Sequence, residues 1–517
     1  MPYLLGLDAG TTSIKAWLYD AASGEPIAGA ARPTPISSPR AGWAEHDPAA
    51  LWSAAAVSIR EALAHAPHAR PIAGLAVASM GEAGVPLDQD GAPVYPIVAY
   101  YDQRSEPYVD WWRTRISPES LHAISGQVLR PVFGAMKLMW LRDAHPELFA
   151  RARRWLSVGD YLIWRLAGVA ATDRTLASRT MLLDQRTRDW SAELLSIAGL
   201  PAGLLPPVYP SGTVVGGVTA EAAAATGLPA GTPVATGGHD HLCGGLAAGA
   251  TAPGDALVSL GTAASLLAPS ATFHGGGAVF AQGLSCYCSV SDGYVVQGGL
   301  SAAGAALAWL ARLLRGSTRP EDYAALERAA AESPPGARGL VCLPHLRGSG
   351  TPERDSAARG AFVGLREQHG PGDMWRALIE GLACWARRNL EAVEAATGQP
   401  IARLTLIGGA ARGALPAQAL ADICGRAVAL PEIAEASARG AALLAGRAAG
   451  LPMLPAGAAR MIAPDSRRVA RYERLYCEVY APLYDALRPI NHAIEGIRDQ
   501  ESGVRSQESG ERPEAIL

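Results

Sequence analysis

One segment near the start of the chain combines a carboxylate, a glycine and three hydroxyls in an order that suits phosphate chemistry. It reads Asp8-Ala9-Gly10-Thr11-Thr12-Ser13. Glycine permits a tight turn, and the hydroxyls of Thr11, Thr12 and Ser13 stand beside backbone N–H groups that can bind a phosphate. An Asp just before such a turn can hold Mg²⁺ through the water shell of the ion. The segment predicts a phosphate-binding hairpin, and an ordinary β-hairpin is the alternative interpretation.

A second segment, Gly237-Gly238-His239-Asp240-His241, predicts a general base. Paired glycines let the backbone bend sharply, so that Asp240 projects and accepts the proton of an attacking hydroxyl. Two other interpretations compete with this one. Asp240 could cap a following helix, or His239, His241 and Cys243 could bind a metal ion.

A third segment, Gly408-Gly409-Ala410-Ala411-Arg412, follows an apolar run. Its small residues would let the planar ring of a nucleotide base lie against the backbone, although Gly-Gly after a strand is also a common turn. The sequence has no GxxxxGKS/T phosphate loop, and no strand–GxGxxG–helix unit stands out. A bound nucleotide would therefore need another phosphate cradle.

Strands and helices alternate around these segments, which indicates an α/β fold. The strand–Gly-Thr–strand pattern recurs at 256–267, where Gly261 and Thr262 form the turn, and it suggests an internal duplication with one unit opening each lobe. The lobe boundary is expected near 248–253. Expected helices span 48–64 (with Asp47 as N-cap), 136–142, 161–166, 301–314, 374–397, 415–424 and 437–449; expected strands span 72–79, 234–236 and 404–407.

Length and charge narrow the class of protein. The 517 residues exceed the roughly 250–300 at which a single hydrophobic core stops growing, so two or three lobes are expected. Lys and Arg total 45 against 48 Asp and Glu, which gives neither the basic surface of a nucleic-acid binder nor affinity for an anionic membrane. The lysines are Lys15 and Lys137 alone, so an anion must be bound by Arg, by one of these two or by backbone N–H groups.

The targeting signals expected of a secreted or membrane protein are missing from the sequence. The N-terminus lacks a basic start and an apolar signal segment, and no run has the length and apolarity of a membrane span. The seven scattered cysteines show no CxxC spacing, which is typical of reduced thiols. A cytoplasmic protein is expected.

Taken in order, the three segments resemble those of the FGGY carbohydrate kinases, members of the sugar kinase, Hsp70 and actin superfamily. The resemblance covers roughly residues 3–450. Its other motifs are Gly42-Trp43-Ala44-Glu45-His46-Asp47-Pro48, Asp102-Gln103-Arg104, Lys137-Leu138-Met139-Trp140-Leu141, Ser259-Leu260-Gly261-Thr262, Arg359 to Leu365 with Ile379-Glu380-Gly381, Gln418 with Ala421-Asp422, and Glu435 to Ala441.

The resemblance implies two ribonuclease H-like lobes of the actin-like ATPase type, with ATP in the cleft between them. An FGGY N-terminal domain on the sugar side would span 1–250 and an FGGY C-terminal domain on the nucleotide side 251–450. A helical extension would follow at 451–497. The last residues, 498–517, repeat a polar tetrapeptide and are expected to be disordered.

The resemblance also implies a role for each site residue. Asp240 would take the proton from a sugar hydroxyl, and Asp8 would position Mg²⁺. Nucleotide contacts would come from Thr11, Thr12, Ser13, Lys15, Gly261, Thr262, Gly304, Gly409, Ala410 and Arg412. Sugar contacts would come from Glu82, Asp102, Arg104 and Asp240. Phosphoryl transfer depends mostly on positioning and charge neutralisation, which these residue types provide.

The acceptor is where the sequence departs from the family. Gly81-Glu82-Ala83-Gly84 stands where xylulose kinases of this family carry Gln-Met-His-Gly and glycerol kinases carry Arg-Glu. Glu82 and Asp102 suit a neutral polyhydroxylated acceptor, because carboxylates accept hydrogen bonds from hydroxyls. An acidic sugar would be repelled unless Arg104 or another Arg compensates.

The function expected from these residues is ATP-dependent phosphorylation of a neutral ketose, such as a pentulose or hexulose. A polyol kinase and a nucleotide-binding sensor without transfer activity are the alternatives, and retention of both Asp8 and Asp240 favours an enzyme. An Hsp70-like chaperone fits less well, because no β-rich peptide-binding domain follows the second lobe. Members of the family are often dimers, so a homodimer is expected from the resemblance alone.

Overall fold

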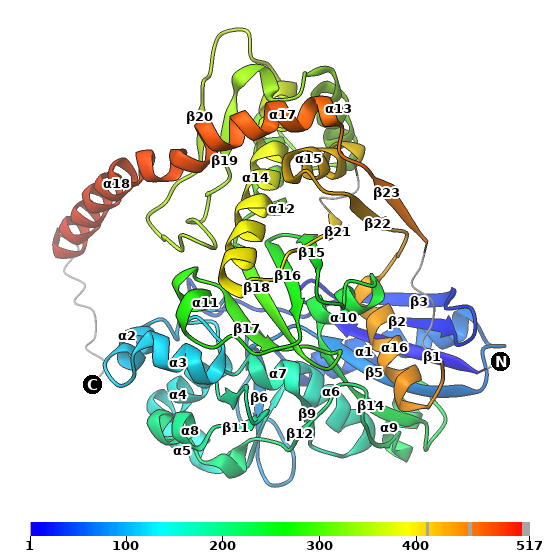
Figure 1. Ribbon diagram of the computed structural model, residues 1–517. Coiled ribbons are helices and arrows are strands. Elements are labelled where there is room, and N and C mark those ends of the chain that lie inside the picture. Colours follow the sequence, from blue (N-terminus) through cyan, green and yellow to red (C-terminus); the bar gives the residue numbers. More distant parts are fainter. Residues whose placement is uncertain (1, 410–412, 453–457, 509–517) are drawn as a thin grey trace. The chain divides into compact units, whose positions relative to one another are not determined.

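The structure is a computed structural model that describes residues 2–409, 413–452 and 458–508 (Figure 1). Its chain divides into two compact units, each assembled from separate segments. Unit 1 comprises Met1–Asp255, Leu267–Gln297 and Pro431–Ala459, and unit 2 comprises Ala256–Leu266, Gly298–Leu430 and Arg460–Leu517. Both units combine strands with helices, as the alternating sequence pattern predicted.

A six-stranded sheet forms the centre of unit 1. Its order is β13-β14-β5-β1-β2-β3. The strands are β1 (Tyr3–Ala9), β2 (Ser13–Asp20), β3 (Pro26–Pro33), β5 (Ile72–Ser79), β13 (Val214–Gly217) and β14 (Pro233–His239). The central strands β1, β5 and β14 run parallel, and β2 and β13 pair antiparallel to their neighbours. Buried on both faces, β1 and β5 are almost continuously apolar, which is typical of parallel strands covered by helices.

Helices cover this sheet, among them α1 (Pro48–His65), α6 (Val158–Ala167), α10 (Asp240–Ala247) and α16 (Ala436–Ala448). Although α16 is far away in sequence, it packs directly on β1, β5 and β14 (Figure 1). The predicted N-cap of α1 is confirmed, because the Asp47 carboxylate accepts a hydrogen bond from the Ala50 N–H at 2.7 Å. The first predicted hairpin is confirmed as well, with Asp8 opposite Lys15 across β1 and β2.

Strand β14 leads directly into α10, and one prediction about this junction was wrong. The two glycines do not form a bend after the strand, because Gly237 and Gly238 belong to β14 itself. The pairing of β14 with β5 skips one residue between Ala235 and Gly238, which is a β-bulge. A Cβ atom at Gly237 would collide with the carbonyl oxygen of Val77. The glycine therefore permits close strand packing, while the bulge re-aims the end of the strand next to Asp240.

Unit 2 contains most of a second sheet, in the order β17-β18-β16-β15-β21-β22-β23, whose edge strand β17 belongs to unit 1. Its strands are β15 (Asp255–Leu260), β16 (Ala264–Ser270), β17 (Ser285–Cys288), β18 (Tyr294–Leu300), β21 (Arg403–Ile407), β22 (Val428–Pro431) and β23 (Ala459–Ile462). Its main helices are α12 (Gly304–Arg315), α13 (Pro320–Glu332), α14 (Pro371–Thr397) and α15 (Ala414–Cys424). β15 and β16 flank the second Gly-Thr turn as neighbours in the sheet, so the repeated strand–turn–strand pattern is present in the structure.

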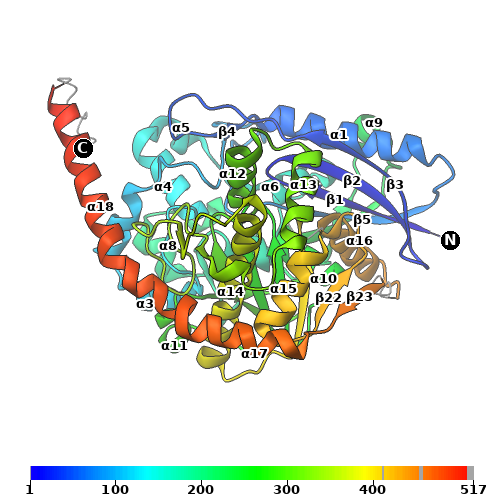
Figure 2. The ribbon, with the colours of Figure 1, turned by 90° about the horizontal axis from the view of Figure 1, so that it is seen from above.

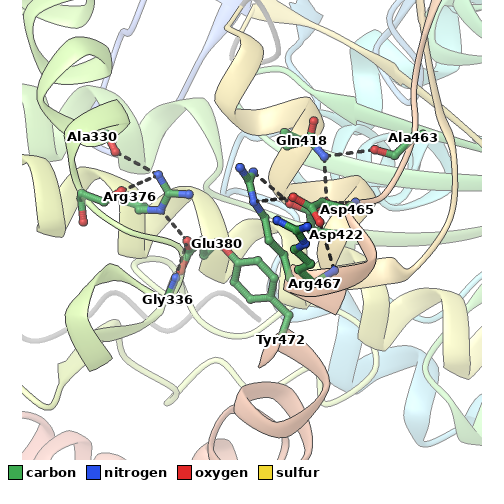
Figure 3. Close-up of polar contacts among 12 residues, drawn as sticks. Ala330, Gly336, Arg376, Glu380, Gln418, Asp422, Ala463, Asp465, Arg467 and Tyr472 are labelled. Carbon is green, nitrogen blue, oxygen red and sulfur yellow. Dashed lines mark hydrogen bonds and ion pairs between the residues drawn. The ribbon is translucent and has the colours of Figure 1, made fainter. Parts of the chain in front are cut away.

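The helical extension of unit 2 consists mainly of α17 (Ser466–Leu475) and α18 (Ala481–Glu508), which follow one another in a long arc (Figure 2). Buried hydrogen bonds attach it to α14 and α15 (Figure 3). The Tyr472 hydroxyl donates to Glu380 Oε1 at 2.6 Å, and the Asp465 N–H donates to Asp422 Oδ1 at 2.8 Å. Gln418 donates to the same Asp422 oxygen and to the Ala463 carbonyl at 3.1 Å, so Gln418, like Asp422, holds the extension in place.

The beginning of the expected disordered tail is helical in the structure. Helix α18 continues past residue 498 to Glu508, and residues 509–517 lie outside the described part of the chain. Gln, Glu and Arg are good helix formers, and extending an existing helix adds a hydrogen bond for each residue fixed. A polar sequence can therefore continue a helix without burying apolar surface.

Within the described residues, no helix combines the length and the apolarity that crossing a membrane requires.

Candidate active site

Asp240 is the first residue of α10, at the end of the bulged strand β14. Its Oδ1 accepts a hydrogen bond from the His241 N–H at 2.7 Å, and Oδ2 accepts none from the part of the chain that the structure describes. Asp240 is therefore not the N-cap of α10, a position held by His239. Burial raises the pKa of Asp240, and the charge of Glu82 raises it further. A half-buried carboxylate with one open oxygen and a raised pKa is able to accept a proton.

His239 lies beside this carboxylate without forming an ion pair. Its Nε2 is 3.4 Å from Asp240 Oδ1, but burial, together with the charges of Arg179 and His241, lowers the pKa of His239 well below its usual value. The imidazole is therefore neutral. The alternative of a metal site here finds no support, because no cluster of three or more His, Cys, Asp or Glu side chains among the described residues has the arrangement of a metal site.

Glu82 follows β5 and is held by a buried arginine. Arg179 donates to Glu82 Oε1 from both Nε, at 2.7 Å, and Nη2. The second oxygen, Oε2, accepts no hydrogen bond from any residue in the described ranges. Glu82 has a φ of 63°, a left-handed conformation that costs a non-glycine residue about 1–2 kcal/mol. Backbone strain of this kind is concentrated at functional sites, where a side chain must be held in one direction.

Asp8, at the end of β1, has the other open carboxylate. The residue is 8% exposed, and its Oδ1 is buried without a hydrogen-bond partner among the residues described. Burial raises the pKa of Asp8 to about 8, with a further contribution from the charge of Asp240, while Lys15 acts in the opposite direction. A buried, unpaired oxygen of this kind has the chemistry of a cation ligand.

Sequence reasoning missed several neighbours of these carboxylates. Arg179 reaches Glu82 from a position 97 residues away, and its Nη1 donates to Gln127 and to Gln297 at 3.3 and 3.4 Å. The phenols of Tyr100 and Tyr287 both lie within the electrostatic influence of Glu82 and Asp240. No spacing or motif marks these residues, because only the folded chain brings them together.

The turn between β1 and β2 carries Thr11, Thr12 and Ser13. It is closed by hydrogen bonds from the Gly10 N–H to the Ser13 carbonyl at 3.1 Å and from Thr34 to the Gly10 carbonyl at 2.7 Å. The three hydroxyls have no hydrogen-bond partner within the described chain, and Thr12 is exposed. Lys15, on β2, is instead engaged, because its Nζ lies 2.6 Å from Glu435 Oε2.

The predicted sugar contacts Asp102 and Arg104 bind each other in a separate cluster. Asp102 Oδ1 accepts from the N–H and Nε of Arg104, each at 2.8 Å, and Oδ2 accepts from Arg104 Nη2 at 2.8 Å and from the Ala44 N–H at 2.6 Å. The Arg104 guanidinium also donates to Glu45 and lies 3.7 Å from the centre of the Trp43 ring. Both oxygens of Asp102 are therefore fully used within the protein.

The remaining predicted nucleotide contacts belong to unit 2. Gly304 begins α12 directly against the second Gly-Thr turn, where its N–H donates to the Gly261 carbonyl at 2.9 Å, and the Ala303 N–H donates to the Thr262 carbonyl at 3.0 Å. A Cβ atom at position 304 would lie 2.6 Å from that Gly261 oxygen, so only glycine allows this contact. Nothing lies within 4 Å of a Cβ built on Gly409. Ala410 and Arg412 fall outside the described residues.

Comparison with known protein families gives two matches along the chain. The FGGY family of carbohydrate kinases, N-terminal domain, matches residues 3–247, and its C-terminal domain matches residues 256–449. The predicted resemblance is thereby confirmed over the range in which it was expected.

Individual relatives agree with the family matches. A glycerol kinase of Citrifermentans bemidjiense is 34% identical over 87% of this chain and 91% of its own length. The xylulose kinase of Escherichia coli is 31% identical over 94% of this chain and 99% of its own length. The crystal structure of a xylulose kinase from Rhodospirillum rubrum superposes with a TM-score of 0.85 at 34% identity, covering 95% of this chain and all of that one. The similarity thus extends to proteins named for two different acceptors.

Proposed function

This chain belongs to the FGGY family of carbohydrate kinases, with their two-domain actin-like ATPase fold, and we propose that Asp240 is the general base with which it phosphorylates its acceptor. Members of the family transfer a phosphoryl group from ATP to a sugar or polyol. In the proposed step, the open Asp240 Oδ2 accepts the proton of one acceptor hydroxyl. The resulting oxygen forms a bond to the terminal phosphorus of ATP, and the bond from that phosphorus to the ADP oxygen breaks.

The observation that carries this proposal is the state of the Asp240 carboxylate. One oxygen is fixed by the His241 N–H, which orients the group, and the other accepts no hydrogen bond within the described chain. Burial and Glu82 raise its pKa, which makes it a better proton acceptor than an exposed carboxylate. Asp8 and Glu82, each with an open oxygen, lie within its electrostatic field, so the site combines three acceptors of cations or hydroxyls.

Mg²⁺ fits the residues around Asp8. The buried Oδ1 without a partner is the feature expected of a group that holds a cation, either directly or through a water molecule. When bound there, Mg²⁺ would neutralise charge on the phosphates. Asp8 would hold the ion, and Lys15 with Glu435 would fix the neighbouring strand.

The nucleotide is proposed to use both Gly-Thr turns. Thr11, Thr12 and Ser13 offer hydroxyls that no described residue occupies, which suits the terminal phosphates. In unit 2, Gly261 and Thr262 with the start of α12 at Gly304 would serve the inner phosphates, because helix N-termini favour anions. Gly409, Ala410 and Arg412 keep their proposed place beside the nucleoside.

The acceptor is proposed to be a small polyhydroxylated molecule of the ketose or polyol type. Relatives named for xylulose and for glycerol support both kinds of acceptor equally. Two free carboxylates would favour a neutral acceptor, but Asp102 is paired with Arg104 and Glu82 with Arg179, so neither is a free carboxylate. The hydroxyls of the acceptor would instead meet Asp240, Glu82 Oε2 and Tyr100.

The proposal is tested by measuring ADP release from the purified full-length protein with a panel of ketoses and polyols, against the ATPase background without acceptor. We expect at least one acceptor to raise ADP release and to appear as its phosphate ester. Asp240→Ala should abolish the increase while ATP still binds. If ATP binds but no acceptor raises ADP release, a nucleotide sensor without transfer activity replaces the kinase.

A further inference from the structure

The backbone in front of Asp240 is held by a side chain from another part of unit 1. The His239 N–H, at the end of β14, donates a hydrogen bond to the Thr175 hydroxyl at 2.8 Å. Both residues are buried, so this contact is shielded from bulk water. Because Asp240 follows His239 directly, the contact fixes the backbone from which the Asp240 carboxylate projects.

The Thr175 hydroxyl is itself oriented by α7 (Arg174–Ser178), the short helix on which it lies. It donates its proton to Asp173 Oδ1, which leaves its lone pairs for the His239 N–H. The same Oδ1 accepts the Thr175 N–H at 2.7 Å and caps the helix, and an Asn at position 173 would offer the same oxygen. The Thr175 hydroxyl is thus a fixed acceptor rather than a freely rotating group.

The other end of α7 leads to Glu82. Arg179 is the C-cap residue of α7, and its Nε donates to Glu82 Oε1 at 2.7 Å. Gly81 lies against both Arg179 and His239, because a Cβ at position 81 would lie 3.0 Å from Arg179 Cγ and 3.2 Å from His239 Cδ2. The two ends of one short helix therefore hold the residue that precedes the proposed base and a carboxylate that is proposed to meet the acceptor.

The β-bulge in β14 explains why this junction is held by a side chain from outside the sheet. A bulge disrupts the ladder of hydrogen bonds, and the pairing of β14 with β5 resumes only at Gly238 and His239. A Cβ at Gly238 would lie 3.2 Å from the Thr175 hydroxyl oxygen, which is tighter than an ordinary van der Waals contact. The second glycine of the pair thus leaves room for α7, and Thr175 adds a hydrogen bond where the ladder is interrupted.

We propose that Thr175 is a positioning residue for phosphoryl transfer: by holding the His239 N–H, its hydroxyl fixes the direction in which Asp240 presents its open oxygen to the acceptor. This inference rests on the proposed function, because Thr175 acts through Asp240 as the general base. Without the hydroxyl the base is still present, but the junction between β14 and α10 is free to shift. Misplacement of a catalytic group by about 1 Å costs about 100-fold in rate.

The test replaces the Thr175 hydroxyl in the full-length protein and measures kcat and KM with the best acceptor of the panel. Thr175→Val keeps the shape of the side chain but places a methyl group against the His239 N–H. We expect kcat to fall by about 10- to 100-fold, while KM for the acceptor and the affinity for ATP change much less. Thr175→Ser, which keeps the hydroxyl, should stay near the native kcat. If Thr175→Val does not fold, Thr175→Ala is measured in its place against the same expectations.

Thr226→Val is the matched control. Thr226 is also fully buried in unit 1, at the end of α9 (Ala220–Thr226), where its hydroxyl accepts from the Leu228 N–H at 3.2 Å and donates to the Ala222 carbonyl at 2.6 Å. Its loss should lower the unfolding temperature, as the loss of the Thr175 hydroxyl does, without lowering kcat. Equal kcat values in Thr175→Val and Thr226→Val overturn the inference, and so does a Thr175→Ser variant that is as slow as Thr175→Val.

A double variant separates this inference from the proposed function. Adding Thr175→Val to Asp240→Asn should cause no further loss of kcat, because the group that Thr175 positions is already lost. A further loss of about 10-fold or more, as additive effects would give, shows that Thr175 acts on another part of the site and overturns the inference alone. If Asp240→Asn by itself keeps the native kcat, the general-base proposal fails, and the inference fails with it.

Discussion

Unit 1 buries two arginine–carboxylate pairs, Asp102–Arg104 and Glu82–Arg179, that differ in how completely each carboxylate is used. Asp102 receives four hydrogen bonds over its two oxygens, and Arg104 is further covered by Trp43. Glu82 receives its hydrogen bonds on Oε1 only. Charge and burial alone therefore do not identify a ligand-binding group. An atom without a hydrogen-bond partner in the fold does, because a ligand can supply that partner.

The backbone supports the same distinction. Asp102 lies in a turn in which its own side chain accepts a hydrogen bond from the Arg104 N–H, as in many structural turns. Glu82 is held at a φ of 63°, which no hydrogen bond of its own explains. Lys137 is buried within the electrostatic influence of both Glu82 and Asp102, and burial lowers its pKa to about 8.

The largest effect on stability is expected from the saturated pair. Asp102→Asn would place an amide NH₂ against the Arg104 guanidinium and leave Glu45 as the remaining counter-charge of that buried group. We expect the free energy of unfolding of unit 1 to fall by about 3–5 kcal/mol. Urea unfolding measures this change. Asp110→Asn, which breaks an exposed pair, is the control and should cost about 0–1 kcal/mol. Equal losses in both variants would mean that the Asp102 cluster is not a structural centre.

The open pair should respond in activity instead. Glu82→Gln keeps the shape of the side chain but weakens the acceptor at Oε2, so we expect kcat/KM for the best acceptor to fall by about 10- to 100-fold. Its loss of stability should be smaller than that of Asp102→Asn. The comparison between the pairs breaks down if Glu82→Gln unfolds as readily as Asp102→Asn yet keeps native kcat/KM.

The pH dependence of stability tests Asp8 as a third open carboxylate. Because burial raises its folded-state pKa to about 8, the folded protein holds a proton that the unfolded chain has released, and stability must fall as pH rises towards 8. In EDTA, the urea midpoint should therefore decrease between pH 6.5 and pH 8. Asp8→Asn should reduce this decrease without abolishing it, because burial also raises the pKa of Asp160 to about 8. An unchanged pH dependence in Asp8→Asn would contradict the account of Asp8.

The smallest effect is expected at the hairpin turn. Thr12→Val removes one open hydroxyl while keeping a residue that suits the turn between strands, so ATP should bind about 2- to 10-fold more weakly. Isothermal titration calorimetry measures the affinity. Thr187→Val, at another exposed threonine of unit 1, should leave it unchanged. Native affinity in Thr12→Val would remove that hydroxyl from the phosphate site.

Local sequence predicted the parts of the molecule that depend on neighbouring residues. The hairpin around Gly10, the Asp47 cap and the strand 72–79 all follow from local turn, capping and periodicity rules, and all are present. The resemblance to the FGGY family assigned Asp240 and both Gly-Thr turns to one fold. The bulge in β14 was missed because it depends on how that strand pairs with β5.

The partners of the site carboxylates could not be predicted in the same way. Glu82 and Asp102 look equivalent in sequence, and only tertiary contacts decide that one is saturated by a neighbour two residues away and the other is held by Arg179.

The most direct test of the central claim is the rate of phosphoryl transfer in Asp240→Asn, measured in a single turnover with the best acceptor. Asp173→Asn is the control, because Asp173 is also buried with a raised pKa but caps α7 (Arg174–Ser178), a position that Asn fills well. We expect Asp240→Asn to slow transfer by about 10²- to 10⁴-fold with unchanged ATP affinity, and Asp173→Asn to stay near the native rate. Equal transfer rates in the two variants would contradict the role of Asp240.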